Sequence, residues 1–250
     1  MTETLASKEV KRIERAVVRI AGDSGDGMQL TGDWFTQESA SFGNDLSTLP
    51  NFPAEIRAPQ GTLAGVSSFQ LHFADYDILT PGDRPDVLVA MNPAALKANL
   101  GDMPAGGTIV VDTHGFNARA LAKIGWAANP LEDGTLENYL VHAYDITQLT
   151  LNAVEGTGLS RKAASRSKNM FALGLLFWMY SRPTEAHATS SAESSHRSPT
   201  FWPRTLPLSR PDGTSVRRPR PSRSAMRSSP LRWPPGRTET SQATRHWPTA

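Results

Sequence analysis

The sequence predicts an α/β fold, built on a mostly parallel Rossmann-like sheet with helices on both faces. Apolar runs rich in Val and Ile, at residues 86–90 (DVLVA) and 107–112 (GTIVVD), alternate with stretches of helical pattern. These runs are apolar throughout, which is typical of strands buried on both faces of a parallel sheet. Residues 16–21 (AVVRIA) form a similar run that leads through a glycine cluster into a helix.

The other elements follow from local patterns. Residues 28–41 predict a helix that ends at Phe42-Gly43, with the glycine in the C′ position. Residues 66–73 (VSSFQLHF) alternate like a half-buried strand. Residues 165–180 predict a helix that is apolar almost all round, so it must be buried against this sheet or against a partner. The remaining expected elements are helices at 94–100 and 146–155 and a strand or short helix at 136–144.

The composition changes sharply after Tyr180. Residues 1–180 contain 14 Lys and Arg against 20 Asp and Glu, a net charge of −6, whereas residues 181–250 contain 12 against 4, a net charge of +8. The second part also holds 11 prolines and 13 serines without hydrophobic periodicity, so we expect a disordered Arg/Pro/Ser-rich tail. We divide the chain into an N-terminal extension at 1–15, one domain at 16–183 and the tail at 184–250.

Two interpretations of the tail are open. Residues 181–250 contain twelve Arg but no Lys, Asn, Ile or Tyr, the residue types whose codons are rich in A and T. This bias favours out-of-frame translation of a GC-rich gene from shortly after Thr184-Glu185, which would make the product a truncated one. The alternative is an arginine-rich arm around Arg217-Arg218 that binds nucleic acid, which is the less favoured interpretation because such patches have low specificity.

The sequence also limits the cellular setting. The absence of cysteine excludes disulfides, thiolate zinc sites and iron–sulfur ligation by this chain. The first 16 residues have no apolar stretch of the secretory type, and the longest apolar run, residues 170–180, is about half as long as a membrane-spanning helix. We expect a cytoplasmic protein that does not bind a membrane.

The glycine cluster at residues 22–27 (GDSGDG) follows a strand and opens a helix, so backbone N–H groups and the helix dipole would favour an anion there. Its spacing differs from the dinucleotide fingerprint G-x-G-x-x-G, and no Lys-Ser/Thr follows as in a P-loop. Asp23 and Asp26 add negative charge, which disfavours tight binding of NAD or ATP. The candidate cofactor-binding residues of the cluster are Gly22, Ser24, Gly25 and Gly27.

Two other interpretations of this cluster are open. Gly25-Asp26-Gly27, together with Asn51, approaches the spacing of a thiamine diphosphate motif, in which Asp and Asn hold Mg²⁺, although Asn51 sits next to prolines. Alternatively, the glycines serve only a tight turn and the close packing of helix on sheet.

Four candidate residues lie outside the cluster. Arg57 is an isolated cation among apolar and glycine neighbours, which suits a carboxylate or phosphate ligand, or else a surface salt bridge. Gly61 and Thr62 open a segment that lets a ligand approach the backbone, or that is simply a mobile turn. Asn92 follows a buried strand, where ligands collect in open α/β sheets, and as Asn-Pro it also suits a helix N-cap.

Other polar residues are not expected to carry chemistry. Asp112 and His114 follow a strand, but no third ligand is near them in sequence, so we expect no metal site. Lys168 and Asn169 precede the apolar helix and are expected to cap it. We identify no catalytic residue.

Four blocks in order along the chain resemble a known family. They are residues 21–35 (AGDSGDGMQLTGDWF), 52–73 (FPAEIRAPQGTLAGVSSFQLHF), 86–100 (DVLVAMNPAALKANL) and 166–185 (RSKNMFALGLLFWMYSRPTE). Together they resemble the N-terminal gamma domain of the α subunit of 2-oxoacid:ferredoxin oxidoreductases, and the 2-oxoglutarate type most of all.

The resemblance implies oxidative decarboxylation of a 2-oxoacid to the acyl-CoA and CO₂, with coenzyme A as co-substrate and ferredoxin as electron acceptor. Thiamine diphosphate and Mg²⁺ would lie between a pyrimidine-binding domain, which follows this one, and a separate β subunit that also holds the iron–sulfur cluster. The family's Mg²⁺-binding GDG belongs to that partner. The expected assembly is a heterodimer or an α2β2 complex.

The resemblance ends after Pro183-Thr184-Glu185, where family members continue into the pyrimidine-binding domain. By itself the chain is therefore expected to bind none of the cofactors thiamine diphosphate, Mg²⁺ and iron–sulfur cluster, and to be inactive. The rival function is a stand-alone anion- or nucleotide-binding module without catalysis.

Overall fold

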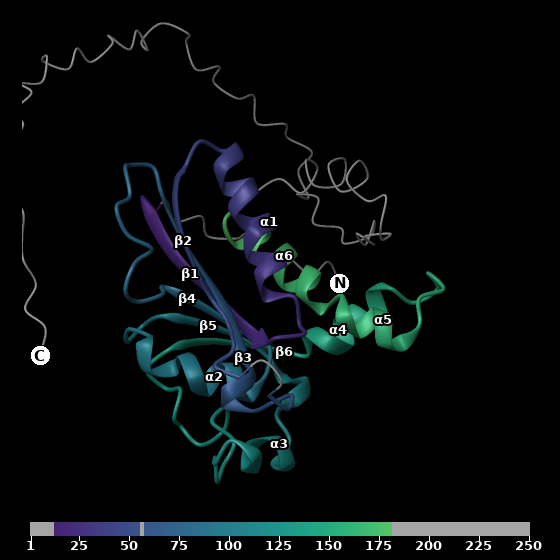
Figure 1. Cartoon of the computed structure of the whole chain (residues 1–250). Coiled ribbons are helices and arrows are strands. Elements are labelled where there is room, and N and C mark those ends of the chain that lie inside the picture. The colour runs from purple at the N-terminus through teal and green to yellow at the C-terminus, as the bar shows by residue number, and fades with distance from the viewer. Residues whose placement is uncertain (1–12, 56–57, 182–250) are drawn as a thin grey trace, which may run out of the picture. The chain divides into compact units, whose positions relative to one another are not determined.

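The order of strands in the sheet decides which loops meet at its edges (Figure 1). The computed structural model describes residues 13–55 and 58–181, which form a six-stranded sheet in the order β2-β3-β1-β4-β5-β6. Strands β1, β4, β5 and β6 run parallel, whereas β3 is antiparallel to both of its neighbours. The strands are β1 (Arg15–Asp23), β2 (Asp45–Asn51), β3 (Val66–Ala74), β4 (Val87–Ala90), β5 (Thr108–Asp112) and β6 (Leu140–Tyr144).

Helices cover both faces of the sheet. Figure 1 shows α1, α4 and α6 on one face and α2 and α3 on the other. The predicted α/β fold is therefore confirmed, with the addition that β3 makes the sheet mixed. The helices are α1 (Met28–Ser41), α2 (Pro93–Asn99), α3 (Ala118–Lys123), α4 (Ile146–Ala153), α5 (Arg161–Arg166) and α6 (Lys168–Met179), and three short 3-10 turns span Leu63–Gly65, Leu100–Asp102 and Thr113–Gly115.

Each face of the sheet has its own core. On the first face Phe35 is fully buried, with the ring of Phe73 edge-on at 5.8 Å and the ring of Phe177 at 6.0 Å. Phe177 belongs to α6, so the apolar helix packs against this sheet, which was one of the two options open from the sequence. The second face buries Leu88 and Ile109 under α2. None of the described helices has both the length and the apolar character needed to cross a bilayer.

The prediction that β3 is half-buried was wrong, because β3 is buried on both of its faces. The segment that leads to β4 crosses the second face and is held there by polar side chains of β3. Gln70 Nε2 donates hydrogen bonds to the carbonyl oxygens of Pro81 (2.8 Å) and Gly82 (2.6 Å), and His72 Nδ1 lies 2.8 Å from the carbonyl oxygen of Thr80. The alternation of polar residues in β3 thus marks a contact with polypeptide and not with solvent.

The sequence patterns did not predict β2. Its sequence, DLSTLPN, is polar and contains Pro50, and its residues are largely exposed. The strand exists because it pairs with β3 from Asp45↔Ala74 to Asn51↔Ser68. An edge strand tolerates proline, since one side of its backbone has no ladder hydrogen bond to lose.

A charged residue lies in the middle of the central strand. Arg19 on β1 is almost buried, and its guanidinium donates to Gln70 Oε1 (2.9 Å) and Asn99 Oδ1 (3.2 Å) and pairs with Asp102. A buried charge is tolerated only when it is paired and hydrogen-bonded. This network lets the sheet keep an arginine beneath α2.

Helix α1 lies so close to β3 that one of its positions has to be glycine. A Cβ atom at Gly32 would lie 2.1 Å from the ring of Phe69, far inside van der Waals contact. We predict that Gly32→Ala lowers the free energy of unfolding by about 1–3 kcal/mol through overpacking, despite the better helix propensity of alanine. Urea unfolding followed by circular dichroism measures the change.

Gly101→Ala is the matched control, because no atom lies within 4 Å of a Cβ atom at Gly101. This variant should differ from the wild type by less than about 0.5 kcal/mol. Equal stabilities of the two variants would contradict the packing of α1 on β3.

Candidate functional site

The glycine cluster and Asn92 lie side by side at the carboxyl edge of the sheet. The parallel pairing of β1 with β4 sets Ala21 opposite Ala90, and Met91 N–H donates to the carbonyl oxygen of Ala21 at 2.9 Å. The register brings Asp23 level with Asn92. Ligands of open α/β sheets bind at this edge.

Two glycines of the cluster are required by packing. A Cβ atom at Gly22 would lie 3.0 Å from Met28 Sδ and 3.2 Å from Met91 Cβ. Gly27 has φ 77°, and a Cβ atom there would lie 2.6 Å from Asn169 Nδ2. These positions support the interpretation of a tight turn with close packing. That interpretation does not account for Gly25, where no atom lies within 4 Å of the Cβ position.

The exposed part of the cluster faces an uncapped helix start. Ser24 and Gly25 are exposed, and the N-cap of α1 is Gly27, which has no side chain to accept from the first N–H groups of the helix. Uncapped N–H groups at a helix start attract oxygen acceptors. The cluster therefore combines open backbone with a positive helix end.

Asp23 anchors a second loop to this edge. Its two carboxylate oxygens lie 3.0 and 3.1 Å from Gly61 N, which donates to them, and Ser24 N–H donates to the carbonyl oxygen of Gly65 at 3.1 Å. Thr62 Oγ1 donates to the carbonyl oxygen of Pro59 at 2.7 Å. The backbone N–H of Gly61 and the hydroxyl of Thr62 are thus engaged within the protein. Arg57, the cation expected in this loop, lies outside the described residues.

Burial raises the pKa of Asp23 above its usual 3.8, and the negative charge of Asp26 adds to the rise. The hydrogen bond from Gly61, the charge of Lys168 and the amide of Asn92 act in the opposite direction and lower the pKa. Desolvation is the largest of these effects. Keeping Asp23 ionised at this edge therefore lowers the free energy of unfolding.

Lys168 offsets the negative charge of the cluster. Its Nζ lies 3.0 Å from Asp26 Oδ2, and the two side chains are mostly buried. The prediction that Lys168 caps the apolar helix was wrong, because Lys168 is the first residue of α6 and pairs with the glycine cluster. No local sequence pattern could predict this ion pair, because Asp26 and Lys168 are far apart in the sequence. The pairing also engages the Asp26 carboxylate that a Mg²⁺ site with Asn51 would need.

Asn92 holds a buried donor that has no acceptor. Its Oδ1 accepts from Ala95 N at 2.7 Å, so the predicted N-cap is confirmed and the orientation of the amide is fixed. Its Nδ2 is buried and has no hydrogen-bond partner, and it lies close to Asp23 without hydrogen-bond geometry. Leaving such a donor unsatisfied costs about 1–3 kcal/mol.

The pair Asp112 and His114 has a structural role. Asp112 is buried and accepts from Thr147 Oγ1 (2.7 Å), Thr147 N (3.3 Å) and His114 N (3.2 Å), which ties the end of β5 to the start of α4. His114 Nδ1 lies 3.3 Å from Asp145 Oδ1. In the described part of the chain, no three His, Cys, Asp or Glu side chains gather as a metal site would require.

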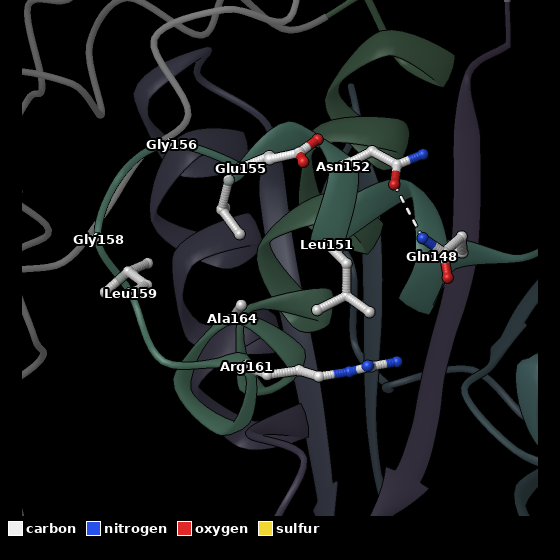
Figure 2. Close-up of a pocket in the computed structure, with 10 residues that line it drawn as sticks. Gln148, Leu151, Asn152, Glu155, Gly156, Gly158, Leu159, Arg161 and Ala164 are labelled. Atoms are coloured by element: carbon white, nitrogen blue, oxygen red, sulfur yellow. Dashed lines mark hydrogen bonds between the residues drawn. The ribbon is translucent and has the colours of Figure 1, made fainter.

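A separate hollow of about 380 Å³ lies between α4 and α5 (Figure 2). Among the described residues, none of the side chains that line it carries a buried polar atom without a hydrogen-bond partner. The carboxyl edge is the better candidate site for that reason. The lining residues are Gln148, Leu151, Asn152, Val154, Glu155, Gly156, Gly158, Leu159, Arg161 and Ala164.

We predict that Asp23→Asn stabilises the protein at about pH 7 and that this gain shrinks as the pH falls towards 3.8. Folding raises the pKa of Asp23, so the ionised group opposes folding above its folded pKa and ceases to do so once it is protonated. Thermal unfolding across this pH range measures the effect.

Asp33→Asn removes an exposed carboxylate of α1 and controls for the change in net charge. A loss of stability in Asp23→Asn at every pH would contradict the prediction. It would show that the bond from Gly61 outweighs the cost of burying the charge.

Comparisons with known proteins agree with the resemblance drawn from the four sequence blocks. A family model for pyruvate ferredoxin/flavodoxin oxidoreductases matches residues 17–194. The chain is 61% identical over 194 residues to the 2-oxoglutarate oxidoreductase subunit KorA of Mycobacterium tuberculosis, a match that covers 78% of this chain and 30% of the relative. It is 34% identical over 97 residues to the ketoisovalerate oxidoreductase subunit VorA of Methanothermobacter marburgensis, covering 38% of this chain and 19% of the relative.

A solved structure shows the same fold. It is the 2-oxoglutarate:ferredoxin oxidoreductase from Magnetococcus marinus with 2-oxoglutarate, coenzyme A and succinyl-CoA bound, at 26% identity and a TM-score of 0.50. The match covers 66% of this chain and 24% of that one. This chain thus spans less than a third of the length of the relatives it matches. It belongs to the pyruvate ferredoxin/flavodoxin oxidoreductase family.

Proposed function

We propose that this chain is the gamma-domain part of a 2-oxoacid:ferredoxin oxidoreductase of the 2-oxoglutarate type. The complete enzyme would oxidatively decarboxylate the 2-oxoacid to the acyl-CoA and CO₂ and pass the electrons to ferredoxin. The identity of 61% to a 2-oxoglutarate oxidoreductase subunit supports this substrate class. The reaction would take place in the cytoplasm.

The redox cofactors would be held by other polypeptide. The chain has no cysteine, so it supplies no thiolate to an iron–sulfur cluster. We assign the cluster, thiamine diphosphate and Mg²⁺ to a β subunit and to a pyrimidine-binding domain. The two curated relatives are themselves named as subunits, which supports a multi-subunit assembly.

Within that assembly, the carboxyl edge would bind part of coenzyme A. The observation that carries this role is the buried Nδ2 of Asn92, a fixed donor that makes no hydrogen bond of good geometry, although the carboxylate of Asp23 lies beside it. The open backbone at Gly25 and the uncapped start of α1 supply further donors beside it. Coenzyme A has carbonyl and phosphate oxygens that match these donors. The related Magnetococcus marinus enzyme was solved with coenzyme A bound, which supports this choice of ligand.

We predict that coenzyme A raises the melting temperature of the chain and that Asn92→Asp weakens this binding at least about tenfold. The variant keeps an oxygen that accepts from Ala95 N, removes the Nδ2 donor and places a second carboxylate beside Asp23, so the helix cap survives while an oxygen-rich ligand loses its contact. A thermal-shift titration with coenzyme A, ATP and NAD measures the affinities.

Asn117→Asp is the matched control, because Asn117 Oδ1 caps α3 in the same way through Ala120 N. It should bind coenzyme A like the wild type. A shift with ATP or NAD but none with coenzyme A would favour a stand-alone nucleotide-binding module instead.

We also predict that the purified chain does not catalyse the reaction alone. Mixed with 2-oxoglutarate, coenzyme A and a viologen acceptor, it should give no reduction above a blank, because the thiamine site would lie in other polypeptide. Viologen absorbance measures this directly. Turnover by the isolated chain would refute the assignment of the cofactors to partner domains.

A further inference from the structure

The outer edge of β6 has unpaired backbone groups. Leu140 N–H donates to the carbonyl oxygen of Gly107 at 3.0 Å, so alternate residues from Leu140 onward direct their backbone towards β5. The N–H and C=O groups of Val141 and Ala143 therefore point away from the sheet. Within the part of the chain that the structure describes, β6 pairs with β5 alone.

The two edges of the sheet differ in how they are protected. Edge strands usually carry charge or proline, which prevents pairing with another chain. At one edge, β2 contains Asp45 and Pro50. At the other, β6 (LVHAY) contains neither a charge nor a proline. This edge is open to a further strand.

One face of β6 also exposes large side chains. Leu140 is 61% exposed and Tyr144 is 43% exposed, and the ring of His142 is parallel to that of Tyr144 at 6.4 Å. The three residues are spaced by two, so they share one face of the strand. They form a continuous stripe beside the free edge.

We propose that β6 pairs antiparallel with β6 of a second copy of this chain. Antiparallel pairing about His142 sets Leu140 of one copy opposite Tyr144 of the other, twice over, and aliphatic–aromatic pairs of this kind stabilise sheets. Because β6 contains no Asp, Glu, Lys or Arg, pairing two copies brings no like charges together within the strand. The stripe is thus complementary to itself, as a twofold interface requires.

Charged residues flank β6 at both of its ends. The segment before the strand carries Glu132, Asp133 and Glu137, all exposed. Beyond the other end, exposed Arg161 and Lys162 begin α5, and Arg161 lines the same hollow as Gln148 in the first turn of α4. Asp145 directly follows Tyr144 at this end, so the antiparallel direction rests on the twofold match of Leu140 with Tyr144 and not on charge. This interface does not depend on the proposed function.

The absence of cysteine allows a direct test by a single engineered thiol. In the proposed dimer His142 faces His142 of the second copy as a non-hydrogen-bonded pair, with Cα atoms about 4.5 Å apart, within the range of a disulfide. His142→Cys should therefore form a disulfide-linked dimer under mild oxidation. Thr48→Cys, at the centre of the other edge strand, is the control. We expect at least tenfold more covalent dimer from His142→Cys, and equal yields would overturn the proposal.

Sedimentation velocity of the unmodified chain provides the second measurement. The chain should dimerise with a Kd between about 1 and 100 µM. Leu140→Lys should raise the dimer Kd at least tenfold, whereas Leu79→Lys, at a side chain that is 95% exposed on another loop, should not. A chain that stays monomeric over this range, or that dimerises while His142→Cys forms no disulfide, contradicts pairing through β6.

Discussion

The parallel register between β1 and β4 is the constraint on which the candidate site depends. It fixes the glycine cluster, which ends β1, at the same level as Asn92, which follows β4. The close packing at Gly22 keeps Met28 and Met91 in contact with the turn, so α1 starts beside Asn92. A change in that register would separate the uncapped helix start from the buried amide donor.

At the carboxyl edge of the sheet, hydrogen-bond donors lie beside two carboxylates, Asp23 and Asp26, whose surroundings differ. Asp26 is neutralised by Lys168 from α6, and Asp23 is partly desolvated and holds the Gly61 loop. Three segments distant in sequence are thus fixed around one small surface. Such fixed donors suit a ligand that brings its own oxygen acceptors, since the protein then reorganises little on binding.

Periodicity predicted the elements whose environment is encoded locally. The bounds of α1 agree with its pattern, and Gly43 adopts φ 81° as a C′ glycine should. The N-cap role of Asn92 was equally visible, because an N-cap is a contact between neighbours in sequence. By contrast, β2 depends on its partner strand, the burial of β3 depends on a crossing loop, and the ion pair of Lys168 with Asp26 depends on the tertiary fold. The unsatisfied Nδ2 of Asn92 could not be predicted either, since burial and missing partners are properties of the folded chain.

The central claim is that the carboxyl edge, and Asn92 in particular, receives an oxygen acceptor of coenzyme A. The most direct measurement is the side-chain amide signal of Asn92 in a nitrogen-15 NMR titration of the chain with coenzyme A. The account predicts that this signal and the backbone signal of Gly25 shift together and saturate at one dissociation constant. Shifts confined to residues around the hollow between α4 and α5, with the Asn92 signal unchanged, would contradict it.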